Sequence, residues 1–302
     1  NISEHDDFQA SYAFDQYDKS DYQPITKLDI RDYSNVQNSL RLLYNHRFDR
    51  GDVLTIGSDF MHDYLYNTNL ENETRNQNTW DLFGQYDWRI SDQWEAVGAV
   101  RYDYFSDGKE SHVTPKLNVC YKPIYNLSIR AGYGMGFRAP TLKEKYYNFD
   151  MAGIWIVEGN ANLKSEVSHN FNLSAEYTKG HYNLTGSVYY NKVKNKLATS
   201  VPYFKTPNDK LPYLPYANLD DYSVCGGEIG AQAKWNNGLG ARLTYAYTKE
   251  QLAKDKDGHT INNQYIPARE HALNARVDFD KQLSKKYGLN IALQGRVLSG
   301  VE

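Results

Sequence analysis

The chain contains no run of about 18 consecutive apolar residues, which is the length that a membrane-spanning helix needs. Its mean hydropathy is −0.73 and 24% of its residues are charged. These properties exclude helical membrane spans. They leave a membrane β-barrel open, because only alternate residues of a barrel strand face lipid.

An excess of basic charge is also missing. The chain has 34 Lys and Arg against 37 Asp and Glu, a formal net charge of −3, and the two signs are interspersed. Without a basic stripe we do not expect a nucleic acid as partner. Cysteine is scarce, and Cys120 and Cys225 lack the CxxC spacing of zinc and redox sites. We interpret both as unpaired strand residues.

Signals of catalysis and of metal binding are absent as well. The sequence has no Gly-x-Ser-x-Gly motif, and no Ser/His or Asp/His constellation gathers at one place. Residues 254–258, Lys-Asp-Lys-Asp-Gly, look like half of a calcium loop but lack the later glutamate. We therefore predict no catalytic residue, no metal site and no intrinsic cofactor.

Tyrosine, in contrast, is abundant: the chain has 27 Tyr, 11 Phe and 5 Trp. Tyrosine suits surfaces that are apolar at one end and wet at the other, such as membrane interfaces and binding loops. From Leu127 to Arg138 apolar residues alternate strictly with polar or small ones. That period of two predicts a long β-strand with one face on hydrocarbon and the other on water. The apolar face consists of Leu127, Ile129, Ala131, Tyr133, Met135 and Phe137.

Thirteen segments alternate in this way between turn residues. They cover residues 8–17, 36–48, 54–66, 80–90, 94–104, 113–121, 127–138, 167–177, 182–190, 229–235, 239–247, 271–279 and 289–297. From residue 19 onward we expect long and short links to alternate, with long ones such as 19–32, 67–78, 201–218 and 249–269. This alternation puts all long links at one end, as in bacterial outer-membrane barrels, which have short periplasmic turns and long outer loops.

Charged side chains at mid-strand positions fit the same fold, because a lipid-facing Arg at the bilayer midplane costs about 2–4 kcal/mol. We expect them to face a wet lumen; examples are Arg41, Asp81, Glu95, Arg101, Arg130, Glu176, Arg242 and Arg296. Thirteen is an odd number, whereas single-chain bacterial barrels have even strand numbers. The sequence begins at Asn1, with neither an initiating Met nor a signal peptide. We expect a piece of a larger barrel.

Two motifs resemble those of the TonB-dependent outer-membrane receptors, which import haem, ferric siderophores or cobalamin. Residues 136–142, Gly-Phe-Arg-Ala-Pro-Thr-Leu, are similar to the family's GFRAP-type box. Residues 159–166, Gly-Asn-Ala-Asn-Leu-Lys-Ser-Glu, are similar to its GNPNLKPE-type box, with Ala161 in place of the usual proline. The residues of this chain that match the family's two boxes are Phe137, Arg138, Ala139, Pro140, Asn160, Asn162 and Leu163.

The resemblance implies an all-β fold: a transmembrane antiparallel up-and-down barrel of 22 strands, of which this chain holds about 13. Residues 1–302 would be the C-terminal part of that barrel, with the N-terminal plug and the final strands not present. The protein would lie in the outer membrane of a Gram-negative bacterium. Its partners would be outer-membrane lipid, the TonB-ExbB-ExbD complex through the missing N-terminal part, and a surface lipoprotein.

The expected transported ligand is haem or another iron complex, with cobalamin or another siderophore as the alternative. Haem receptors of the family carry an iron-ligating histidine between the two boxes, and residues 141–162 contain none. Tyrosine can also hold haem iron. We predict ligand contacts from outer-loop residues, namely Tyr146, Tyr147, Trp155, Arg138 and His259. The alternative is that the aromatic residues pack the loop on itself and that Arg138 is a structural charge.

Two other classes of function compete with a gated importer. An outer-membrane barrel enzyme, a protease or a lipase, would need the catalytic constellation that the sequence lacks. A passive porin or an adhesin would lack the paired boxes. We therefore expect a receptor and not an enzyme.

Overall fold

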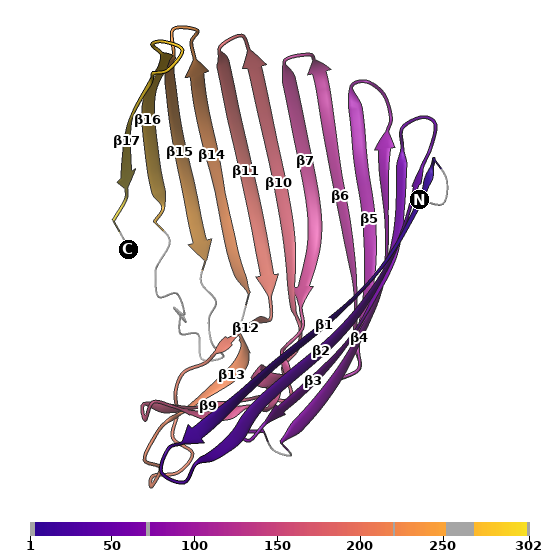
Figure 1. Ribbon diagram of the computed structural model, residues 1–302, viewed down its shortest axis with the longest axis vertical. Coiled ribbons are helices and arrows are strands. Elements are labelled where there is room, and N and C mark those ends of the chain that lie inside the picture. Colours follow the sequence, from indigo (N-terminus) through magenta and orange to yellow (C-terminus); the bar gives the residue numbers. More distant parts are fainter. Residues whose placement is uncertain (1–3, 71–72, 220, 252–268, 301–302) are drawn as a thin grey trace.

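The computed structural model describes residues 4–70, 73–219, 221–251 and 269–300. Over these residues thirteen strands form one antiparallel sheet in chain order, which curves into a trough (Figure 1). The strands are β1 (Asp6–Gln23), β2 (Leu28–Arg47), β3 (Val53–Asn67), β4 (Thr74–Arg89), β5 (Trp94–Phe105), β6 (Glu110–Ile124), β7 (Leu127–Arg138), β10 (Glu166–Lys179), β11 (Tyr182–Lys194), β14 (Tyr222–Lys234), β15 (Leu239–Gln251), β16 (His271–Gln282) and β17 (Gly288–Leu298). The predicted thirteen-stranded, up-and-down meander is confirmed.

The predicted alternation of long and short links is only partly correct. Residues 19–32, expected as a link, are mostly strand, because β1 and β2 pair from Asp6↔His46 to Gln23↔Leu28. The expected link 67–78 likewise lies partly in β4, which starts at Thr74. Strands pair through backbone groups, which polar and apolar residues share, so the apolar alternation ends before the strand does.

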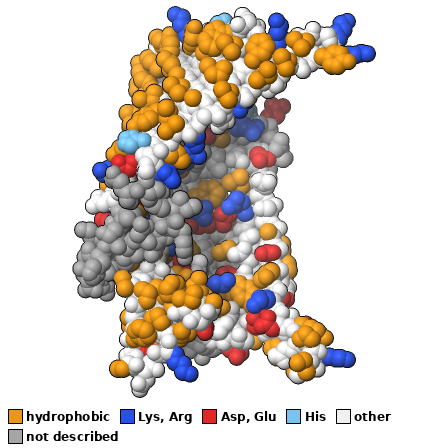
Figure 2. Space-filling view, turned by 90° about the vertical axis from the view of Figure 1, so that its left-hand side faces the viewer, with side chains coloured by type: hydrophobic (Ala, Val, Ile, Leu, Met, Phe, Trp, Pro, Cys, Tyr) orange, Lys and Arg blue, Asp and Glu red, His pale blue; other side chains and the backbone are white. Residues whose placement is uncertain are grey.

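The two faces of the sheet differ as the pattern predicts. Large apolar side chains on the outer face are exposed, for example Leu117 at 52% and Ile229 at 68%. Charged side chains on the other face bond to one another across neighbouring strands, as Arg41 of β2 does to Asp59 of β3. In Figure 2 hydrophobic side chains gather over the upper part and across the lower part of the view, and basic and acidic side chains lie in the hollow between them.

A second, smaller sheet lies at the loop end of the trough, and the sequence pattern did not reveal it. Its four strands run in the order β12 (Lys196–Thr199), β13 (Tyr213–Leu219), β9 (Trp155–Glu158) and β8 (Asn148–Met151). The pair β13 and β9 is parallel. One short helix, α1 (Leu142–Tyr146), precedes β8. Two loops far apart in sequence, 139–165 and 195–221, therefore share one sheet, which we call the loop sheet.

Most of the buried apolar side chains lie in or next to these loops, and the others, Leu65 and Val193, lie near the loop ends of β3 and β11. Leu65, Leu70 and Leu142 form a cluster with exposed fractions of 3–5%, and Tyr33, Tyr146 and Tyr147 pack against it. The cluster ties α1 to the rim of β2 and β3. Within the described ranges, no helix has the length and apolar character that a membrane crossing requires.

Candidate functional site

The first motif box ends β7 and starts α1 through a capping box. Thr141 is the N-cap residue, and its hydroxyl accepts a hydrogen bond from the backbone N–H of Glu144. The Glu144 carboxylate in turn accepts from the backbone N–H of Thr141 at 2.8 Å. This reciprocal arrangement satisfies two of the unpaired N–H groups at the helix start. A helix of a single turn thereby becomes a fixed element of the rim.

Arg138 joins the two motif boxes to the loop sheet. Its Nη1 donates to both carboxylate oxygens of Glu144, at 2.9 and 3.0 Å. Its Nη2 lies 3.7 Å from Oε2 of Glu166, the last residue of the second box, and donates to the carbonyl oxygen of Leu197 in β12 at 3.4 Å. One guanidinium group thus connects four segments of chain, because its planar fork presents several donors at once.

The second box forms a tight turn against α1. The side-chain oxygen of Asn160 accepts from the N–H of Asn162 at 3.0 Å, and the N–H of Asn160 donates to the carbonyl oxygen of Glu144 at 2.9 Å. The turn approaches the helix so closely that a Cβ atom at Gly159 would lie 2.8 Å from the Tyr147 nitrogen. Glycine is therefore required at the first position of the box. Leu163 is 3% exposed and closes the turn.

Asn218 of β13 joins the second box to the other loop. Its side-chain oxygen accepts from the N–H of Lys164, and its amide nitrogen donates to the carbonyl oxygens of Lys164 and Asn195, all within 2.8–2.9 Å. Asn160 adds a bond to the carbonyl oxygen of Tyr216 at 3.0 Å. These contacts hold loop 195–221 on loop 139–165.

The predicted loop residues Tyr146 and Tyr147 lie against the buried cluster. The Tyr146 hydroxyl donates to Asp107 at 3.0 Å, and the Arg75 guanidinium lies over its ring at 4.4 Å. Burial, together with the bond to Asp107, raises the pKa of Tyr146. Asp107 also pairs with Lys145, which is 5% exposed. The Tyr147 ring packs on Phe149 with 4.8 Å between centroids.

An ion pair joins loop 195–221 to the end of β9 in the loop sheet. Lys205 lies 2.6 Å from Glu158 of β9, and the Tyr203 hydroxyl bonds the other oxygen of that carboxylate. The hydrogen bond to Glu158 raises the pKa of Lys205. The Lys205 ammonium group also rests 4.0 Å from the ring centroid of Tyr213. Trp155, another predicted site residue, lies at the other end of β9 and donates to the Met151 sulfur at 3.0 Å.

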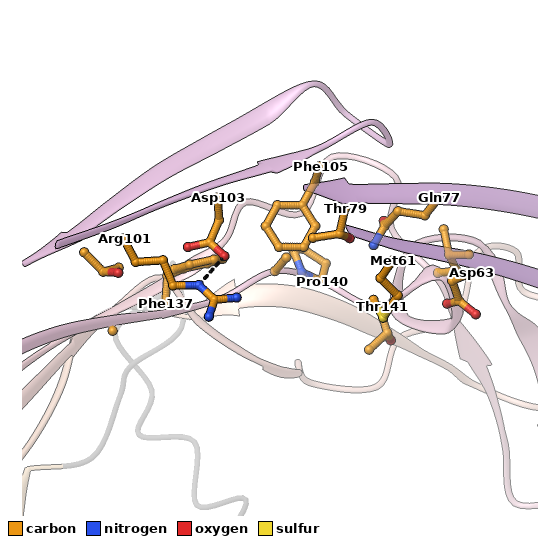
Figure 3. A pocket seen from close by; sticks show the side chains of 14 residues that line it. Met61, Asp63, Gln77, Thr79, Arg101, Asp103, Phe105, Phe137, Pro140 and Thr141 are labelled. Carbon is orange, nitrogen blue, oxygen red and sulfur yellow. Dashed lines mark hydrogen bonds and ion pairs between the residues drawn. The ribbon is translucent and has the colours of Figure 1, made fainter. Parts of the chain in front are cut away.

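A cavity of about 590 Å³ lies between the lumen wall and the first box. Its wall side comes from β3, β4, β5 and β6, and its other side from residues 136–142. Figure 3 shows Arg101 and Asp103 at one end, Met61, Asp63 and Gln77 at the other, and Phe105 and Pro140 between them. The loop body therefore roofs a space that opens on the lumen.

Phe137 departs from its predicted place. The alternation puts it on the outer face, but its ring stacks on His112 at 4.4 Å and meets Phe105 edge-on at 5.6 Å, inside the cavity. The reason is the pairing of β7 with β6, which extends only to Lys116↔Gly134. Beyond that point the two strands diverge, and Phe137 fills the gap between them.

Below the cavity a chain of charges crosses the lumen wall, and the sequence predicted its members only in part. Arg101 bonds Asp81 and Asp103 at 2.8 Å each and lies 3.9 Å from Asp59. Asp59 also accepts two bonds from Arg41. Asp81 and Asp103 are only 2–3% exposed, so these carboxylates depend on Arg101 for compensation.

The structure thus gathers most predicted residues at one rim, where Arg138, Tyr146 and Tyr147 share α1 and its surroundings. His259 lies outside the described residues. Sequence reasoning missed Glu144, Asn218 and Asp107. The pattern Thr141-x-x-Glu144 is a capping-box signal that could have identified the first, whereas the other two act over long distances in sequence.

The family model described as "TonB dependent receptor-like, beta-barrel" matches residues 2–300. Among curated relatives, the chain is 25% identical over 179 residues to the vitamin B12 transporter BtuB of Photobacterium profundum, which covers 56% of this chain and 28% of the relative. It is 27% identical over 133 residues to the iron-regulated outer membrane virulence protein of Vibrio cholerae, covering 42% of the chain and 20% of the relative. The chain thus matches less than a third of either relative.

Solved structures share the fold. The siderophore receptor PirA from Acinetobacter baumannii has a TM-score of 0.69 at 16% identity, over 95% of this chain and 46% of that one. The FrpB iron transporter from Neisseria meningitidis has a TM-score of 0.70 at 16% identity, over 96% and 47%. The chain spans about half of each solved relative. With its strand order, its two motif boxes and the match over residues 2–300, the chain belongs to the family of TonB-dependent receptor β-barrels of the Gram-negative outer membrane.

Proposed function

We propose that the chain is the C-terminal barrel portion of a receptor that imports a scarce nutrient, with an iron complex as the foremost candidate. In the whole protein an N-terminal plug would fill the trough and the TonB-ExbB-ExbD complex would supply energy. A surface lipoprotein is a further partner of this proposal. The barrel would carry its ligand unchanged, without an enzymatic step.

The roofed cavity is the observation that carries the proposal. A loop body fixed by Arg138 and Asn218 covers a space of about 590 Å³ on the lumen side. A passive pore gains nothing from so many bonds within its outer loops. A receptor does, because a fixed loop body loses less conformational entropy when it captures a ligand.

The names of the curated relatives support two ligand classes. One relative is called a vitamin B12 transporter and the other an iron-regulated protein. We place an iron complex first, a ferric siderophore or haem, and cobalamin second. For haem the donors would be loop tyrosines, because residues 141–162 hold no histidine.

Uptake by the full-length receptor tests the proposal. Cells that express it with and without functional TonB are offered a ⁵⁵Fe-loaded catecholate siderophore, a ⁵⁵Fe-loaded hydroxamate siderophore, haem or cyanocobalamin. We expect TonB-dependent uptake of one iron complex; for haem, a Soret shift on titrating the purified receptor identifies the ligand. Uptake of cyanocobalamin alone would move the assignment to the second class. Equal entry of small solutes with and without TonB would overturn the importer in favour of a pore.

A further inference from the structure

A groove of about 460 Å³ lies on the outer face of the sheet, across β6, β7, β10 and β11. The strand register arranges its outward side chains in two rows. One row holds Leu117, Tyr133, Phe171 and Tyr190, and the next holds Val119, Ala131, Leu173 and Val188. Ala131 is the one small side chain in the two rows, so the larger side chains around it form the walls of the groove.

The groove is apolar and unprotected by the protein. Phe171, Leu173 and Val188 are each about half exposed, between 48% and 56%. In the outer membrane this face meets hydrocarbon. A concave apolar surface at that level gains dispersion contacts only if a chain of matching width fills it.

One end of the groove leads to cationic side chains on the same face. His169 lies two residues before Phe171 on the same face of β10 and is paired with Lys192 of β11. Two residues closer to the loop end, Val167 is paired with Lys194. Tyr133, which lines the groove, has its hydroxyl 3.0 Å from His169 Nδ1. Lys192 reaches Asp221 at 2.8 Å. These residues are near the loop end of their strands, which is the outer side of the membrane.

The spacing along the strand suits a lipid. From Val188 to Lys194 is six residues, roughly 20 Å at about 3.4 Å per residue. A strand tilted by about 40° covers roughly 15 Å of membrane depth over that distance, which is half of the hydrocarbon thickness of about 30 Å. If Lys194 stands at the outer interface, Ala131 stands near the midplane, where an acyl chain of the outer leaflet ends.

We propose that this face is a binding site for a phosphate-bearing lipid of the outer leaflet. One acyl chain lies in the groove over Ala131, and the headgroup phosphate pairs with Lys192 and Lys194. Phosphate would compete with Asp221 for Lys192, and juxtamembrane lysines attract anionic lipid. The site depends on the membrane location of the family and is independent of the transported ligand.

Native mass spectrometry of the full-length receptor in detergent tests the site, with purified lipid A as probe and its dephosphorylated form as comparison. Ala131→Phe fills the groove, and Lys192→Gln with Lys194→Gln removes the headgroup contacts. Ala231→Phe is the matched control, because Ala231 also faces outward, between Leu184 and Leu243, away from the groove. Heat-modifiable mobility on a gel verifies that each variant is folded.

We expect the wild type to retain one tightly bound lipid A and the dephosphorylated form to bind about tenfold or more weakly. Ala131→Phe and the double lysine variant should show a loss of similar size, and Ala231→Phe should equal the wild type. Equal binding of both lipid forms would overturn the proposal, as would undiminished binding by Ala131→Phe. A dimer without a lipid adduct would overturn it in favour of a second copy as occupant.

Discussion

The Arg138 guanidinium lies 2.9 and 3.0 Å from the two carboxylate oxygens of Glu144, although the two residues belong to different elements, a barrel strand and a one-turn helix. Glu144 also completes the capping box of that helix. The same carboxylate therefore starts the loop fold and attaches it to the barrel wall.

Replacing Glu144 with Ala should release the loop body from the barrel. The variant loses a charge-assisted bond and a helix cap, worth together about 2–4 kcal/mol of local stability. Hydrogen exchange of the Tyr147 and Asn160 amides, which bond to carbonyl oxygens of α1, should accelerate accordingly. Lys164→Gln serves as control, because Lys164 is exposed and bonds to Asn218 through its backbone atoms. Unchanged protection of both amides in Glu144→Ala would show that the contact is dispensable.

Gly159→Ala should separate the second box from α1. The added Cβ would lie 2.8–2.9 Å from backbone atoms of Tyr147 and Lys145, and backbone cannot yield as a flexible side chain does. Overpacking of this kind costs about 1–3 kcal/mol. Limited proteolysis should cut the outer loops of the variant faster than those of the wild type. Gly98→Ala is the matched control, because nothing lies within 4 Å of a Cβ there, and equal cleavage of the two variants would contradict the prediction.

The large sheet could be predicted because the alternation that specifies each strand is a local pattern in the sequence. In β7 each residue's face follows from its neighbour two positions away, and the alternation from Leu127 onward states this directly. The same rule placed Arg41, Asp81 and Arg101 on the lumen side. It failed at Phe137, whose ring turns to the lumen beyond the last paired residues of β6 and β7, although β7 still pairs with β10 there.

The loop sheet could not be predicted, because the residues that pair in it are far apart in the sequence. Strand β9 is four residues long and pairs in parallel with β13, in register from Tyr213↔Ile156. Strands so short carry too little alternation to be recognised. The bonds of Asn218 to Lys164 depend on where two loops meet, and no spacing in the chain encodes that meeting. The sequence analysis missed Glu144 as well, although its capping pattern Thr141-x-x-Glu144 is local and could have been recognised.

Arg101→Met should destabilise the barrel wall more than Arg41→Met. Arg101 compensates Asp81 and Asp103, which are almost fully buried. Removing one partner of a buried ion pair costs about 3–5 kcal/mol, and since the Arg101 side chain is itself 41% exposed, we expect the lower end, about 3 kcal/mol. Arg41 pairs only with the less buried Asp59 and should cost about 1 kcal/mol or less. Urea titration of the refolded full-length receptor measures both, and equal losses would refute the ranking.

Raising the pH above about 10 should loosen α1 from the rim through Tyr146. Its folded-state pKa is raised above the ordinary tyrosine value of 10.0 by burial and by the bond to Asp107. A raised pKa means that folding favours the neutral phenol, so this contribution is complete below pH 10 and is lost as the pH rises through the folded-state value. Hydrogen exchange of the Tyr147 amide, corrected for the intrinsic base-catalysed rate, should lose protection over that range. Tyr146→Phe cannot ionise at this position and should abolish the dependence. A wild type and a Phe variant with the same pH profile would assign the loosening to another group.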